Sequence, residues 1–153
     1  MRRRAMLATG VAAVALWLPA ASAATGGTGA PGPGVPVSWQ RTAVADGDLA
    51  GRIGVRLVRV SVSGAGGLID LRYQVVDPAR AAAVHAAATP PAIVDERTGL
   101  VLAQLLMDHA HSGPLKPAVT YYLLFDNPGG WVHRGATVTV LLGDAQVEHV
   151  VVA

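Results

Sequence analysis

The residues best suited to chemistry lie in the segment Met107-Asp108-His109-Ala110-His111. In extended backbone, alternate side chains point to the same side, so His109 and His111 could chelate one ion. Met107 has the same parity and adds a soft thioether. Imidazoles with a thioether suit copper, and imidazoles with the carboxylate of Asp108 suit zinc. The segment therefore predicts a copper or zinc site.

A site built on two histidines needs a third or fourth ligand. His133, in the segment Trp131-Val132-His133-Arg134, is the first candidate, and His85 and His149 follow it. His149 has the parity of Val147 and Val151, which favours a packed, hydrogen-bonded histidine there.

A simpler interpretation of the same segment requires no metal. Met107 then ends the core of a strand, and His109 and His111 are solvated loop residues or hydrogen-bonded turn formers. The two interpretations differ in whether the chain has a resident metal ion.

Catalytic motifs are missing from the sequence. It contains no G-x-S-x-G, no H-E-x-x-H, no Gly-rich phosphate loop and no cysteine nucleophile. Asp95 and Glu96 precede Arg97-Thr98-Gly99, which favours a hydrophilic hairpin turn over an acid–base pair. Asp70 and Arg72 are expected to form a solvated surface pair. We therefore expect no enzymatic activity and, apart from the metal hypothesis, no cofactor.

Trp131 follows Gly129-Gly130 and precedes Val132. If exposed, it would contact a protein or glycan partner, and if buried, it would fasten its loop to the domain. The apolar and glycine neighbours favour burial.

The N-terminus has the layout of a secretion signal. Arg2, Arg3 and Arg4 precede an apolar stretch from Ala5 to Pro19, which ends before Ala21-Ser22-Ala23. The stretch is shorter than the roughly 20 apolar residues of a membrane span. Residues 1–23 are therefore predicted to be a cleaved signal peptide, which leaves a secreted or periplasmic protein with no membrane span.

Composition narrows the range of partners. Without its first 23 residues the chain has 9 basic and 10 acidic side chains, a net charge of −1, which offers no general attraction to nucleic acid. There are no cysteines, so stability must come from an apolar core rather than from disulfides. About 130 residues can bury one such core.

The patterning predicts a flexible Gly/Pro-rich leader over residues 24–53 and one β domain over residues 54–153. Ile69, Leu71, Tyr73 and Val75 alternate with polar residues, and this strand should pair with residues 55–63 across a glycine turn. A phase slip near Leu57 indicates a β-bulge. Further strands follow at intervals of eight to twelve residues, with one short helix that begins at Asp77-Pro78. The fold class is therefore all-β, an antiparallel sandwich of about seven strands.

The stretch from Leu115 to Tyr121 contains Leu115, Pro117 and Tyr121. It resembles the L-x-P-x-x-x-Y motif of fibronectin type III and other immunoglobulin-like domains, with Ala118 where a glycine is usual. The resemblance implies an immunoglobulin-like sandwich in which the tyrosine hydroxyl returns to the backbone. The whole plan is similar to small secreted bacterial domains of that type, and that similarity implies no particular activity.

Size, export and a late histidine flanked by glycines also resemble the periplasmic copper carriers of immunoglobulin-like fold. Those carriers place a histidine at the mature N-terminus, whereas this chain would begin Ala-Thr-Gly-Gly, so their ligands do not transfer. The sequence thus supports two hypotheses. The first is an exported, non-enzymatic β-sandwich module that binds an unidentified ligand, with a protein as a candidate partner. The alternative is an extracytoplasmic copper protein that uses Met107, His109 and His111.

A thermal melt separates the two hypotheses. One equivalent of copper or zinc should raise the melting temperature of the chain from Ala24 onward if it binds only the folded state. A His109→Ala/His111→Ala variant should then show no shift. If no metal changes the melting temperature of the parent, the copper hypothesis is wrong.

Overall fold

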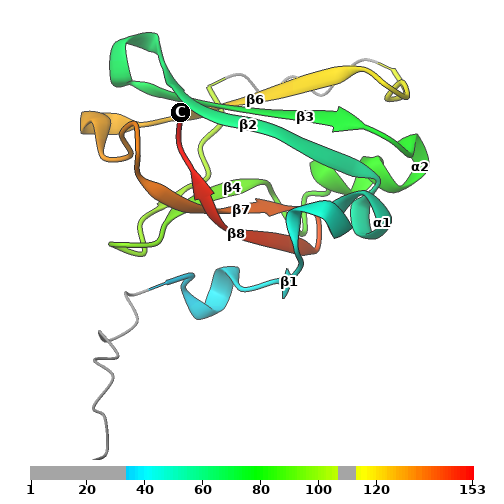
Figure 1. Cartoon of the computed structure of the whole chain (residues 1–153), viewed down its shortest axis with the longest axis horizontal. Coiled ribbons are helices and arrows are strands. Elements are labelled where there is room, and N and C mark those ends of the chain that lie inside the picture. The colour runs from blue at the N-terminus through cyan, green and yellow to red at the C-terminus, as the bar shows by residue number, and fades with distance from the viewer. Residues whose placement is uncertain (1–33, 107–112) are drawn as a thin grey trace, which may run out of the picture.

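The computed structural model describes residues 34–106 and 113–153, which form a two-layered β structure (Figure 1). The predicted signal peptide, the start of the predicted leader, and Met107, His109 and His111 lie outside the described residues. The strands are β1 (Thr42–Ala43), β2 (Val55–Ser63), β3 (Leu68–Val75), β4 (Ala92–Asp95), β5 (Val101–Leu102), β6 (Thr120–Asp126), β7 (Thr137–Leu142) and β8 (Ala145–Val151). The α-helices are α1 (Leu49–Ile53) and α2 (Pro78–Ala81), and the 3-10 turns are η1 (Val37–Trp39), η2 (Asp46–Asp48), η3 (Gly64–Gly66), η4 (Ala82–His85) and η5 (Pro128–Gly130).

The strands form two sheets. One has the order β2-β3-β6 and is antiparallel, and the other has the order β1-β8-β7-β4-β5. Only β1 pairs in parallel, beside Ala145 and Gln146 of β8. The described part of the chain thus has eight strands, close to the predicted number, and the predicted β-sandwich character is confirmed.

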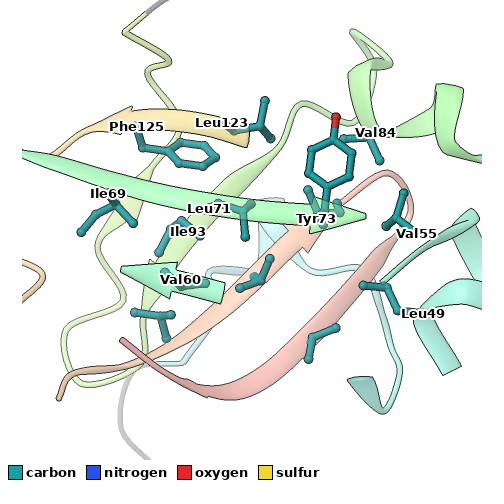
Figure 2. Packing of buried hydrophobic residues seen from close by; sticks show 14 of the residues in the cluster. Leu49, Val55, Val60, Ile69, Leu71, Tyr73, Val84, Ile93, Leu123 and Phe125 are labelled. Atoms are coloured by element: carbon teal, nitrogen blue, oxygen red, sulfur yellow. The ribbon is translucent and has the colours of Figure 1, made fainter. Parts of the chain in front are cut away.

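The core fills the space between the sheets. Ile69, Leu71, Tyr73 and Val75 of β3 are each 0% exposed, as their alternation predicts. Figure 2 shows Ile69, Leu71 and Tyr73 beside side chains from other strands, among them Ile93 of β4 and Phe125 of β6. Burial of these apolar side chains supplies the main force that holds the two layers together.

The predicted hairpin and bulge are both present. β2 and β3 pair around η3, and their register shifts between Leu57 and Arg59. The bulge turns Val58 outward, where it is 52% exposed, although simple alternation along the strand would place it on the same side as the buried Val60. One inserted residue is enough to reverse a side chain in a strand of period two.

The predicted helix at Asp77 is also present. The carboxylate of Asp77 accepts hydrogen bonds from the backbone N–H groups of Ala79 and Arg80, and Pro78 occupies the first turn. These contacts satisfy donors that a helix start leaves without partners.

The packed domain begins earlier than residue 54, where the sequence analysis ended the leader. Helix α1 lies within residues 24–53 and buries Leu49 and Ile53 in the main core. It ends at Gly54, whose φ is +71°, and a Cβ there would collide with the backbone oxygen of Asp77. The helix is too short for a periodic pattern to reveal it, so only its packing identifies it as part of the domain.

Substitution of Ile53 tests this boundary. Ile53→Ala should lower the free energy of unfolding by about 2–5 kcal/mol, because it opens a cavity in the core. Val58→Ala removes an exposed aliphatic side chain and should change it by about 0.5 kcal/mol or less. Urea unfolding of both variants measures the difference. Equal stability of the two would mean that α1 does not pack as described.

Candidate functional site

Trp131 lies beside the turn that joins β4 and β5, and is 54% exposed. Together they line a pocket of about 340 Å³. In Figure 1, the turn between β4 and β5 lies at the end of the sandwich opposite α1 and α2. The lining residues are Asp95, Arg97, Thr98, Gly99, Leu100 and Trp131. This pocket combines an exposed large aromatic residue with charged groups.

The prediction that Trp131 is buried is wrong. Val132, the next residue, occupies the core position and is 1% exposed, which leaves the indole outside. Gly129 and Gly130 have φ values of +70° and +64°, and these backbone conformations decide which of the two neighbouring side chains turns inward. The sequence alone does not show which of these two side chains faces the core.

A buried asparagine holds the loop of Trp131 in place. The side-chain amide of Asn127 donates to the backbone oxygens of Gly66 and Val132, both at 2.8 Å, and its oxygen accepts from the backbone N–H of Val132 at 3.1 Å. Asn127 is 0% exposed. Its bonds fasten the loop to the tip of the β2–β3 hairpin, so Trp131 is presented on a fixed support.

The facing turn carries opposite charges. Asp95 is buried, and its Oδ2 accepts a hydrogen bond from the Thr98 hydroxyl. The Arg97 side chain is 74% exposed, with Nη2 at 3.9 Å from the same oxygen. A pocket lined by an indole and a guanidinium suits a ligand that combines an apolar surface with polar edges.

Glu96 points away from Asp95 and binds β7 and β8. Its Oε1 accepts hydrogen bonds from the Thr139 hydroxyl at 2.9 Å and from the backbone N–H of His149 at 2.7 Å, and Oε2 lies 2.9 Å from His149 Nδ1. Asp95 and Glu96 are therefore not arranged as a facing pair of carboxylates. They form part of a turn, as the sequence predicts.

His149 sits at a bulge in β8 with φ at +61°, a conformation that is uncommon for a residue other than glycine. Its hydrogen bond agrees with the sequence analysis, but its side chain is 79% exposed and therefore not packed. The imidazole lines a cleft of about 700 Å³ between the edges of β2 and β8, with Arg59, Glu148 and Asp46 among the other lining residues.

The charges of this pair depend on each other. Burial alone would raise the pKa of Glu96, but hydrogen bonds from His149 and Thr139 and the nearby imidazolium lower it below 4.5. The hydrogen bond and charge of Glu96 raise the pKa of His149 above 6.5. Both partners are therefore charged, and the ion pair is formed, at pH values between the folded-state pKa of Glu96 and that of His149.

The predicted fourth metal ligand, His133, is exposed, and its Nδ1 lies 3.0 Å from the backbone oxygen of Arg134. Met107, His109 and His111 lie outside the described residues, so their relation to His133 stays a prediction. His85 contacts the hydroxyl of Tyr73 at 2.9 Å. Within residues 34–106 and 113–153, no group of three or more histidines and carboxylates could hold a metal ion.

Comparison with known proteins gives no relative. No protein-family model matches the chain, and neither a curated protein nor a solved structure resembles it closely enough to count as a match. In the two described ranges, no helix has the length and apolar character needed to cross a membrane. Function must therefore be argued from the residues themselves.

The pH dependence of stability tests the Glu96–His149 pair. The raised pKa of His149 contributes stability that is full below pH 6.5 and lost as pH rises through the folded-state value. The lowered pKa of Glu96 contributes stability that is present above pH 4.5 and lost as pH falls through the folded-state value. We expect His149→Asn, which tolerates a positive φ, to lower the melting temperature more at about pH 5.5 than at about pH 9.

The matched control is His133→Asn, because His133 is an exposed histidine without a carboxylate partner among the described residues. It should change the melting temperature equally at both pH values. If His149→Asn behaves in the same way, the ion pair does not contribute to folding.

Proposed function

We propose that this protein is an exported, non-enzymatic, immunoglobulin-like module that binds a partner through the surface around Trp131. The observation that carries the proposal is an exposed indole on a loop that Asn127 holds through the backbone of Val132, in a pocket shared with Asp95 and Arg97. Aromatic side chains and arginines dominate binding energy at protein interfaces, and a fixed support lowers the entropy lost on binding.

The strand order supports the immunoglobulin-like assignment. β2-β3-β6 corresponds to strands A-B-E of that fold, and β4, β7 and β8 correspond to C, F and G. The hydroxyl of Tyr121 accepts a hydrogen bond from the backbone N–H of Lys116 at 2.9 Å, the return contact that the resemblance implies. One departure is clear. In the family this tyrosine begins strand F, whereas Tyr121 lies in β6, which pairs with β3.

The larger cleft beside His149 supports partner binding less well. It has two basic residues, Arg59 and His149, and two acidic ones, Asp46 and Glu148, but no aromatic anchor. Both strand edges that flank it carry a β-bulge, a feature that prevents another strand from pairing there. We therefore assign partner binding to the Trp131 surface.

The proposed location outside the cytoplasm rests on the secretion layout of residues 1–23, and the partner is then a secreted or periplasmic protein. The alternative function, a copper-binding protein built on Met107, His109 and His111, rests on the sequence and is tested by the metal-dependent melts. The two proposed functions use different loops, so an experiment that disproves one leaves the other open.

Site-specific crosslinking tests the binding proposal. A diazirine amino acid at position 97, next to Trp131, should give a discrete adduct when the producing cell exports the protein. Trp131→Ala should reduce that adduct by about thirtyfold, since an aromatic anchor contributes about 2 kcal/mol or more to binding. The yield of the adduct is measured by mass spectrometry.

The control places the same crosslinker at position 37, where Val37 is 85% exposed. It should give no such adduct. An identical adduct at both positions, or one that survives Trp131→Ala in a protein with unchanged melting temperature, would overturn the proposal.

A further inference from the structure

The outer face of the β2-β3-β6 sheet carries a group of exposed arginines. Arg56 and Arg59 extend from β2, and Arg72 extends from β3. Arg59 and Arg72 are direct cross-strand partners. Like charges directly opposite each other destabilise a sheet, so this arrangement has a cost that an anion would remove.

Few acidic groups balance these charges. Asp70 pairs with Arg72 at 2.9 Å, and neither Arg56 nor Arg59 forms an ion pair with any residue that the structure describes. Asp46 and Glu148 share a cleft with Arg59 but do not pair with it. Arg56, Arg59 and Arg72 against Asp70 leave a charge of +2 in these rows, and Asp126, on the same face of β6, lies two rows beyond the row of Arg72 and Tyr122.

Asp70 holds Arg72 in position rather than competing for a ligand. The sequence analysis expected a solvated pair, but Asp70 is only 7% exposed. One carboxylate oxygen accepts from Arg72, at 3.0 Å from Nε, and the other is buried without a hydrogen-bond partner among the described groups. The guanidinium is therefore fixed over a buried anion, with its remaining donors directed at solvent.

An aromatic residue lies in line with Arg59 and Arg72 across the sheet. Tyr122 of β6 is the cross-strand partner of Arg72 on its other side and is 51% exposed. Because neighbouring strands lie about 4.8 Å apart, the row Arg59, Arg72 and Tyr122 spans roughly 10 Å across three strands. Gln74 and Ser61, on the rows beside it, add hydrogen-bonding side chains.

We infer that this outer face binds an extended polysaccharide that carries carboxylates. The planar guanidinium groups of Arg56 and Arg59 match carboxylates in bidentate geometry, and the ring of Tyr122 offers an apolar face to a sugar ring. Of the three arginines and Tyr122, only Arg59 lines a described pocket, so the face suits a long chain better than a small molecule. The choice of a polysaccharide rests on the export expectation and is independent of the Trp131 site.

Retardation in a gel that contains polygalacturonate tests the inference with the full chain, in which Arg2–Arg4 are common to every sample. The wild-type protein should be retarded, and Arg56→Gln/Arg59→Gln should bind about a hundredfold more weakly. This follows from about tenfold per charge-assisted hydrogen-bonding group. Arg72 is left in place, because its removal would leave Asp70 buried without a partner.

The matched control is Lys116→Gln/Arg134→Gln, which removes two exposed positive charges outside both proposed surfaces. It should bind as the wild type does, and so should Trp131→Ala, even if the Trp131 proposal fails. Fully methyl-esterified polygalacturonate should retard none of the proteins. Equal loss in both double variants would assign the effect to net charge and overturn the inference. Binding to phosphatidylglycerol vesicles without binding to polygalacturonate would also overturn it.

Discussion

Burial of the inner face of β3 is the interaction on which the rest of the structure depends. β3 is the central strand of its sheet, and Ile69, Leu71, Tyr73 and Val75 are fully enclosed between the two layers. Because side chains alternate along a strand, fixing this face inward also fixes Arg72 outward. The same strand thus sets the core and one exposed surface.

Buried polar groups then position the parts of the surface that could act. The buried Asn127 binds the backbone of Val132 next to Trp131, the half-buried Glu96 binds His149, and the buried Asp70 binds Arg72. These contacts fix the backbone beside Trp131 and the side chains of His149 and Arg72, and a buried polar group that lacked such a partner would be costly. Only Asp70 keeps one oxygen without a partner among the described residues, so its ion pair with Arg72 has the most influence on local geometry.

Local signals in the sequence were reliable where the physics is local. The alternation of residues 69–75, the helix cap at Asp77 and the bulge near Leu57 depend on neighbours within a few positions. The boundary between the leader and the domain, predicted at residue 53, does not depend on such local signals. Leu49 and Ile53 belong to a five-residue helix that packing stabilises, and no periodicity develops over such a length.

By itself, the sequence determined the β-sandwich character, the hairpin, the helix start and the turn at Asp95 and Glu96, because alternation and turn chemistry act between neighbours. Tertiary structure decided which side chains face water at positions where the sequence pattern does not. It turned Val132 inward and Trp131 outward, and it placed Arg59 opposite Arg72. Those outcomes depend on strand register and on loop backbone angles, which are set by contacts between segments far apart in the chain.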